Sequence, residues 1–418
     1  MWFYVDRILV GYQKADAAAH ARPRGNLSDL YPRWLGAREL LLHQRNPYSD
    51  EVTVEIQKGY YGRALDAARA DDPKDRQGFA YPVYVVFLLA PLIGFPFSGV
   101  QIFFHWLLLA LTVASVWLWL QALRWEVPAL GVVAAMLLTL GSFPAVQGIK
   151  LQQLSLLVAA IMAGAVALVA SGFLFCGGAL LAVATIKPQL VWPLVGWMLV
   201  WALSDWRARR RFVFGFGFVM ALLLIGAEMV LPGWWRMFVA AVGQYHAYTQ
   251  NQSVLEVIVD EATGLSGRVG HICGEVLAVV AFLACLPGLW RWRREREESP
   301  QFGDAVALLL ALTVVVVPMY APYNQVLLLP AILLLARNRT RLGVRSRPLR
   351  FGIVAGGLLF GWQWIASLWL TVIYLLGFRD KALGDWRWPF FATFAVPVCV
   401  FVLIFFDVRD LQMRDQAD

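Results

Sequence analysis

The chain has 418 residues, of which 60% are hydrophobic and only 15% are charged. A soluble protein carries about a quarter charged residues, so this composition excludes an ordinary soluble enzyme. A net charge of +8 would suit a nucleic-acid partner, but the arginines gather at the ends of apolar runs, which argues against that class. We predict an all-α polytopic membrane protein that forms one integral domain over residues 1–418.

The first ten residues, MWFYVDRILV, resemble the last turns of a spanning helix. They lack the basic start and the apolar middle of a signal peptide. We expect that a start codon further upstream would supply the first part of this helix and bring the number of spans to twelve.

Residues 11–80 form a large polar loop that we place outside the cytoplasm. Ser28 or Asp29 is predicted to cap a helix that ends before Asn46 and Pro47. Apolar residues recur on one stripe of that helix, at Leu30, Trp34, Ala37 and Leu41. The stripe predicts an amphipathic helix on the outer leaflet, with Trp34 as its interface anchor.

The segment 81–97 is apolar but too broken for a full span. Its interruptions are Pro82, Pro91, Gly94 and Pro96. Irregular backbone at membrane depth is tolerated where protein covers it. We therefore predict a re-entrant or interfacial helix.

Eleven further apolar segments are predicted to span the membrane. They lie near residues 101–123, 128–145, 154–171, 172–186, 190–203, 212–231, 271–290, 303–320, 323–337, 351–376 and 389–406. They form two bundles, 101–231 and 271–406, on either side of a second large outside loop at 232–270. A cytoplasmic tail at 407–418 follows.

Arginines gather at three breaks between these spans, near residues 207–211, 291–296 and 337–350. Short loops rich in Lys and Arg stay in the cytoplasm. The predicted spans place all three clusters on one side. The shorter segments that then face outside are 147–154, 187–189, 321–325 and 377–389.

Some ionisable residues lie at the outer ends of spans. Lys187 and Gln189 flank a helix-breaking Pro188. A lysine on that side runs against the charge trend, so it either pairs with a lipid phosphate or only snorkels to the interface. Glu228 lies near the outer end of another span, where an ionisable group is a functional candidate.

Polar side chains of the outside loops suit the recognition of sugar hydroxyls. In the second large loop they are His246, Tyr248, Asn251, Gln252, Ser253 and Glu256. They suit an ordinary solvated loop equally well. Tyr323 and Asn324 occupy either a binding turn or a plain hairpin turn.

Metal-binding patterns are missing from the sequence. The four cysteines, Cys176, Cys273, Cys285 and Cys399, form no CxxC pair, and no DxD motif occurs. We predict no cofactor and no metal ligand set, and leave open whether a divalent metal held by scattered acids is required.

Several of these residues form short motifs in a fixed order between residues 27 and 335. The motifs are Asp29 with Tyr31, Asn46-Pro47-Tyr48, Tyr81-Pro82, Gln147-Gly148, Lys187-Pro188, Asn251-Gln252-Ser253 and Tyr323-Asn324. Their order resembles glycosyltransferase family 87, membrane enzymes of the GT-C fold. Two motifs depart from that family, because the Gly-Gln order is reversed and a second proline after Tyr81 is replaced by Val83.

The resemblance implies transfer of a mannose- or arabinose-like unit from a polyprenyl-phosphate donor to a glycan or lipid acceptor. The site would face outward from the cell inner (plasma) membrane. Such enzymes use an aspartate of the first outside loop as general base, a position that Asp29 occupies here. From the residues alone, Asp29 could equally cap its helix or pair with Arg33.

The substrate-binding candidates are Lys187, Gln189, Arg33, Tyr31, Asn251, Gln252, His246, Tyr323, Asn324 and Gln147. Lys187 is the first candidate to stabilise a leaving phosphate, with Arg24 or Arg33 next. The alternatives are a multi-pass transporter or flippase of lipid-linked substrates and a non-catalytic scaffold. A transporter would be expected to show repeated halves, and no clear repeat occurs.

Overall fold

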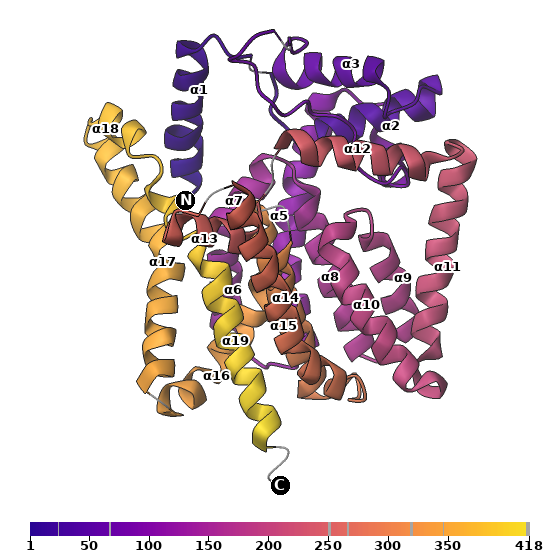
Figure 1. The fold of residues 1–418 in the computed structure, drawn as a ribbon, viewed down its shortest axis with the longest axis vertical. Coiled ribbons are helices and arrows are strands. Elements are labelled where there is room, and N and C mark those ends of the chain that lie inside the picture. The colour runs from indigo at the N-terminus through magenta and orange to yellow at the C-terminus, as the bar shows by residue number, and fades with distance from the viewer. Residues whose placement is uncertain are drawn as a thin grey trace.

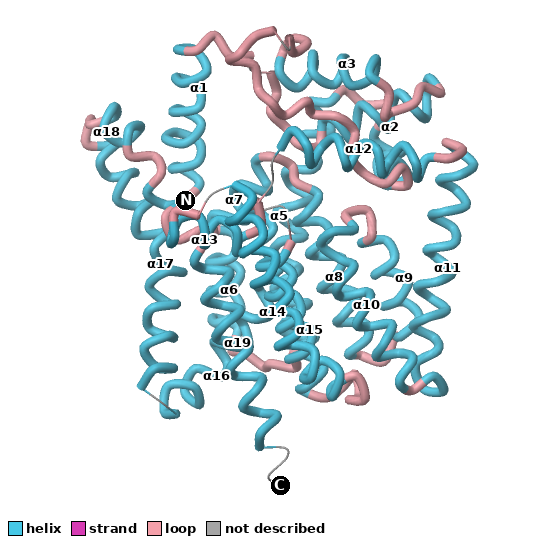
Figure 2. Tube along the Cα trace, viewed as in Figure 1, coloured by secondary structure: helices cyan, strands magenta, loops and turns pink. Residues whose placement is uncertain are grey.

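A computed structural model shows an all-helical molecule (Figures 1 and 2). It describes residues 1–23, 25–66, 68–249, 252–265, 267–317, 321–345 and 347–414. No strand occurs in those ranges, so the predicted all-α class is confirmed.

The first half of the chain builds the polar loop and the first helices of the bundle. Its elements are η1 (Tyr4–Leu9), α1 (Val10–Ala19), α2 (Tyr31–His43), α3 (Asp50–Tyr61), α4 (Val85–Leu89), η2 (Ala90–Leu92), α5 (Phe97–Ala122), α6 (Ala129–Leu140), α7 (Phe143–Lys150), α8 (Leu154–Ala170) and α9 (Leu174–Ala184).

The second half of the chain contributes the second polar loop and the remaining helices of the bundle. Its elements are α10 (Pro188–Ser204), α11 (Trp206–Val230), α12 (Trp234–Thr249), α13 (Val254–Thr263), α14 (Gly267–Trp292), α15 (Pro300–Val316), η3 (Pro322–Leu328), α16 (Leu329–Arg345), α17 (Arg347–Leu375), α18 (Arg379–Gly384), η4 (Trp388–Phe390) and α19 (Ala395–Arg414).

Several helices are long and apolar enough to cross a bilayer. Five described segments meet that test: Phe97–Ala122, Trp206–Val230, Gly267–Trp292, Phe351–Leu375 and Arg379–Arg409. The pair α6 and α7 passes it as one broken span, and four shorter apolar helices accompany them. The chain is therefore a multi-pass membrane protein.

The predicted span 128–145 is wrong as a continuous helix. α6 ends at Leu140 with Gly141 as its C-cap residue, and α7 follows at an angle of 57° to it. Ser142 caps α7 by accepting a hydrogen bond from the Ala145 amide, and Pro144 occupies its first turn. Both features favour a new helix start, so the chain bends where the apolar run suggested continuity.

Small residues let the helices of the bundle approach closely. A Cβ added to Gly178 of α9 would lie 2.1 Å from the Phe212 carbonyl oxygen of α11, and one added to Gly215 would lie 2.0 Å from the Phe175 oxygen. Backbone contact of this kind is how helices pack tightly where lipid removes the hydrophobic drive.

The amphipathic stripe of α2 faces protein. Leu30 and Ala37 are fully buried, and Trp34 is 5% exposed. The Trp34 indole donates a hydrogen bond to the Leu92 carbonyl oxygen at 3.2 Å. The prediction of Trp34 as a lipid anchor was therefore wrong, because the broken segment α4–η2 covers the stripe.

The two ends of the molecule differ in character (Figure 1). The helices α2, α3 and α12 lie together at one end, where Asn46 contacts the Met237 sulfur at 3.2 Å. The connections α10–α11 and α14–α15 and the C-terminal end of α16, which carry arginines, lie at the other end. The two large polar loops thus meet through α12 on the side opposite those connections.

Candidate functional site

Asp29 lies just before α2 but does not cap it. The helix begins at Tyr31 with Leu30 at the N-cap position, and no side chain caps it. The backbone of Asp29 is held instead: its amide donates to the Leu151 oxygen at 2.9 Å, and Arg33 donates to its carbonyl at 2.7 Å. The predicted capping role was wrong, and the carboxylate is left for other partners.

The carboxylate of Asp29 accepts two hydrogen bonds from distant parts of the chain. The Tyr60 hydroxyl, at the end of α3, donates to Oδ1 at 3.1 Å. The Gln153 amide, just before α8, donates to Oδ2. Three segments therefore fix the orientation of a half-buried carboxylate.

A buried lysine lies on the other side of Gln153. Lys187 is 5% exposed, and its Nζ donates to Ser155 Oγ at 2.5 Å and more weakly to Gln153 Oε1 at 3.5 Å. The Ser155 hydroxyl donates onward to Asn324 Oδ1 at 2.9 Å. One polar network thus runs from the carboxylate to η3.

Aromatic rings support the two cations of this network. The Lys187 ammonium lies 5.2 Å from the centre of the Tyr323 ring. The Arg33 guanidinium lies 4.5 Å from the centre of the Tyr81 ring. Both distances are within the range of cation–π attraction, which holds a cation without neutralising it.

Polar atoms around Asp29 retain unused hydrogen-bonding capacity. Within the described residues, Arg33 Nε, Ser28 Oγ and Gln147 Oε1 are buried without a partner. Buried polar atoms are rarely left unpaired, so such a group calls for an explanation. The unused Arg33 donor is available to an anionic ligand.

Burial shifts the pKa values of the two central groups in opposite directions. Burial raises the pKa of Asp29, against the opposing effects of Arg33 and of the hydrogen bonds from Gln153 and Tyr60. Burial likewise lowers the pKa of Lys187. A carboxylate with a raised pKa is a stronger proton acceptor near neutrality than an exposed one.

Backbone strain occurs next to both residues of the hydrogen bond between Gln153 and Asp29. Leu27, two residues before Asp29, has φ 54°, and Gln152, next to Gln153, has φ 49°. Residues other than glycine rarely adopt this left-handed conformation, which costs energy. The contact between Asp29 and Gln153 is therefore made at a cost in backbone conformational energy.

Helix α12 brings tyrosines from the second loop to this region. Burial raises the pKa of Tyr245 to about 12, and the charged groups acting on it are Asp75, Arg33 and Asp29. Tyr248 lies near Asp75, Tyr245 and Arg33. The second loop therefore contributes aromatic side chains to the surroundings of Asp29.

Some predicted residues lie elsewhere. Tyr31 turns its hydroxyl onto Gly59 of α3 and packs its ring on Phe97. His246 is exposed on α12, and Gln252 donates to Asp260 at 2.7 Å. The hydrogen bonds of the described residues connect none of these three side chains to Asp29.

The remaining candidates have separate positions. Gln189 is half-buried in the first turn of α10, and Gln147 lies on α7. Glu228 is exposed and accepts a hydrogen bond from the Gly233 amide at 2.8 Å, which closes the end of α11. Asn251 and Arg24 lie outside the described residues.

Sequence reasoning missed Gln153, Ser155 and Tyr60. Gln153 and Ser155 flank the start of an apolar span, where polar residues usually only mark the interface. Tyr60 ends a helix of the polar loop. The available signal was a pair of adjacent glutamines, Gln152 and Gln153, directly before the apolar run.

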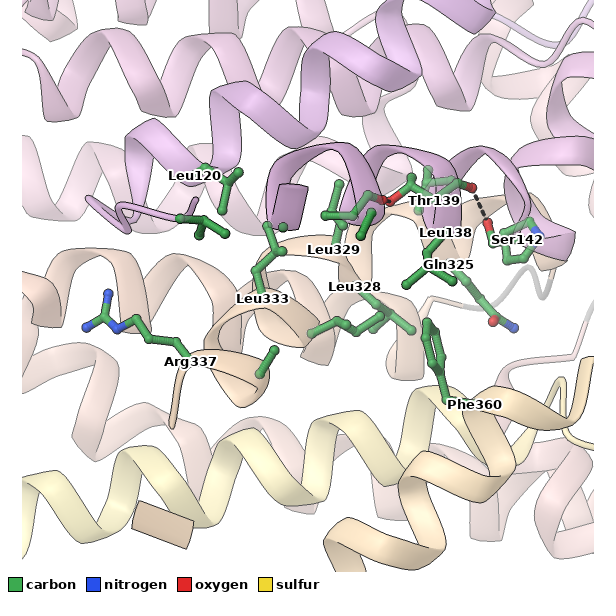
Figure 3. Close-up of a pocket in the computed structure, with 18 of the residues that line it drawn as sticks. Leu120, Leu138, Thr139, Ser142, Gln325, Leu328, Leu329, Leu333, Arg337 and Phe360 are labelled. Atoms are coloured by element: carbon green, nitrogen blue, oxygen red, sulfur yellow. Dashed lines mark hydrogen bonds between the residues drawn. The ribbon is translucent and has the colours of Figure 1, made fainter. Parts of the chain in front are cut away.

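A large cavity lies beside this network, between α6, α16 and α17 (Figure 3). It has a volume of about 700 Å³ and mainly apolar walls. Gln325 and Ser142 lie at one end and Arg337 at the other, with leucines between them. Successive residues of η3 therefore contact the Lys187 network, through Asn324, and this cavity, through Gln325.

No group of three or more metal-ligating side chains occurs among the described residues.

Comparison with known proteins gives one positive result. The model of glycosyltransferase family 87 matches residues 79–318, a range that contains Gln153 and Lys187 but not Asp29. No curated protein and no solved structure matches the chain.

Proposed function

The chain belongs to glycosyltransferase family 87, and from that premise we propose that it moves a hexosyl or pentosyl unit from a polyprenyl-phosphate donor to a glycan or lipid acceptor. A mannose- or arabinose-like unit is the proposed cargo. The observation that carries the proposal is one buried network that holds a carboxylate and a lysine on opposite sides of a single glutamine.

Asp29 is the proposed general base. The acceptor hydroxyl attacks the anomeric carbon while Asp29 takes its proton, and the bond to the lipid phosphate breaks with its electron pair leaving on the phosphate. Burial raises the pKa of Asp29, which suits this role because a carboxylate with a raised pKa is a better proton acceptor than an exposed one. One displacement inverts the configuration at the anomeric carbon.

Lys187 and Arg33 are the proposed anchors of the leaving phosphate. A lipid phosphate gains negative charge as it departs, and fixed cations stabilise that charge most in a site with little water. Lys187 is almost fully buried, and Arg33 has a buried donor without a partner in the described structure. Both groups can therefore bind an anion without losing an ion pair.

The apolar cavity beside η3 is the proposed position of the donor's isoprenoid tail. Most of its lining residues are apolar, and its polar end lies one residue along η3 from Asn324. Bulk placed halfway along it, as in Leu329→Trp, should raise the KM for a long-tailed donor more than for a short-tailed one. An equal effect on both tail lengths would reject this position.

The proposed location is the inner (plasma) membrane, with the site facing outward. The arginine-bearing connections lie at the end opposite α2 and α3 (Figure 1), and such connections stay in the cytoplasm. An impermeant thiol reagent should label a cysteine introduced at exposed Asp50 in intact cells. Labelling only after lysis would end this orientation.

The decisive test is transfer in membranes supplied with a panel of radiolabelled polyprenyl-phosphate sugars. Asp29→Asn should reduce transfer by about a thousandfold, within the range for loss of a general base. Asp50→Asn, an exposed acid of the same loop, is the matched control and should retain activity. Full transfer by Asp29→Asn would reject the base, and movement of the donor across the bilayer without transfer would favour a transporter.

A further inference from the structure

Gln153 contacts both chemically active groups of the proposed site. It is 4% exposed and is the N-cap residue of α8, but its side chain makes no capping bond. The amide nitrogen donates to Asp29 Oδ2 instead, and the amide oxygen accepts from Lys187 Nζ at 3.5 Å. Its side chain is thus committed to the network and not to its own helix.

The chemistry of the two neighbours fixes how this amide points. An ionised carboxylate only accepts hydrogen bonds, and an ammonium group only donates them. The NH₂ group must therefore face Asp29, and the oxygen must face Lys187. An amide carries a donor and an acceptor on the same carbon, so the Gln153 side chain satisfies both sides at once.

We propose that Gln153 is a positioning residue that keeps the base ionised and aimed while holding it apart from the lysine. This inference rests on the proposed function. A direct ion pair between Asp29 and Lys187 would occupy the lone pairs that receive the acceptor's proton and the charge that receives the leaving phosphate. The glutamine links the two groups and leaves one face of each available to a substrate.

The backbone supports a fixed position for this side chain. The backbone N–H of Gln153 donates to the backbone oxygen of Gly148 at 2.8 Å, and the preceding Gln152 adopts a left-handed conformation. The adjacent Leu151 oxygen binds the Asp29 amide at 2.9 Å. The turn that carries the glutamine is therefore attached to the loop that carries the carboxylate.

Replacing Gln153 by side chains of similar size distinguishes the positioning role from a role in packing alone. Gln153→Met fills the same space without hydrogen bonds, and Gln153→Glu keeps the shape but places a second carboxylate against Asp29. The matched control is Gln101→Met. Among the described hydrogen bonds, the Gln101 side chain makes one, to the side-chain oxygen of Gln152 at 3.2 Å, and none to Asp29 or Lys187.

The experiment measures the pH dependence of kcat/KM for sugar transfer in membranes. Losing a hydrogen bond to the charged form raises the pKa of a carboxyl, so the acid limb should move upward by about one pH unit in Gln153→Met. Gln153→Glu should move it further, because two adjacent carboxylates resist ionising together. At neutral pH we expect about a tenfold fall, mainly in kcat, and an unchanged profile for Gln101→Met.

The outcomes separate this inference from the proposed function. If Asp29→Asn abolishes transfer but both Gln153 variants fold and retain the wild-type acid limb, the positioning role is rejected and the base remains. Reduced activity with an unmoved limb would indicate packing only and reject it as well. Full transfer by Asp29→Asn would instead overturn the function on which the inference depends.

Discussion

Two buried cations, Lys187 near Asp29 and Arg209 at the opposite end, show how similar surroundings serve different purposes. Lys187 is 5% exposed and Arg209 is 2% exposed. Each lies over an aromatic ring, Tyr323 at 5.2 Å and Trp201 at 4.3 Å. Neither forms a salt bridge with a carboxylate in the described structure.

Their hydrogen-bond partners separate them. Arg209 donates to backbone oxygens of Trp201 and of residues 293–295, at 2.6 to 3.2 Å. The hydrogen bonds described for Lys187 are to side chains, among them those of Ser155 and Gln153. Backbone oxygens cannot move aside without unfolding a loop, whereas side chains can rotate. We infer that Arg209 stabilises the fold and that Lys187 is available to a ligand.

The strongest test of this difference is Lys187→Gln. It should lower kcat/KM for sugar transfer by about a hundredfold, because a removed electrostatic donor typically costs that much. Its thermal midpoint in detergent should change little, since a buried charge is expensive to desolvate. Lys150→Gln removes a lysine from the same region that pairs with Asp6, and should keep nearly full activity.

Arg209→Gln should give the reverse result. Several backbone oxygens would lose their donor, and each buried unsatisfied group costs about 1–3 kcal/mol. We expect the thermal midpoint and the yield of folded protein to fall, with the activity of the folded fraction unchanged. A normal thermal midpoint with reduced activity would contradict the assignment.

The pH profile of transfer sharpens the comparison. In the proposed mechanism, transfer requires Asp29 to be ionised and Lys187 to be protonated. Burial raises the pKa of Asp29 and lowers that of Lys187, so both limbs should move inward from the ordinary values of about 3.9 and 10.4. Measuring kcat/KM between about pH 4 and pH 10 should give a narrowed bell, and Lys187→Gln should lose the alkaline limb.

The smallest effect is expected from Ser155→Ala. Ser155 is fully buried and links Lys187 to Asn324, so its loss should reduce kcat/KM about fivefold by loosening the ammonium group. Ser115→Ala is the control, because that buried serine donates only to Thr112 of its own helix, at 2.8 Å, among the described contacts. Equal effects of both changes would point to general loosening of the bundle.

The sequence was sufficient to predict the helical segments and several members of the site. Apolar length defines spans well, and charge at their ends indicates a common side. Lys187 stands out against the charge trend, whereas the family resemblance points to Asp29 and to the Tyr323-Asn324 turn. The structure links these residues and Arg33 through one network.

The direction in which each side chain points could not be predicted in the same way. Tyr31 follows Asp29 by two residues, which on a helix turns it to another face, onto Gly59. The role of Gln153 depends on contacts across 124 residues of sequence. A bend such as the one after Gly141 also depends on local capping, which apolar length does not report.

The order in which the network's members leave the ribosome has a consequence for biogenesis. Asp29 is made first, but its partners arrive in steps at residues 153 and 187, and the network reaches Asn324 last. Most of the bundle is thus synthesised before the polar cluster is complete. A nascent chain halted before η3 would sit in the bilayer with an unfinished centre, so damage late in translation should yield inserted but inactive protein.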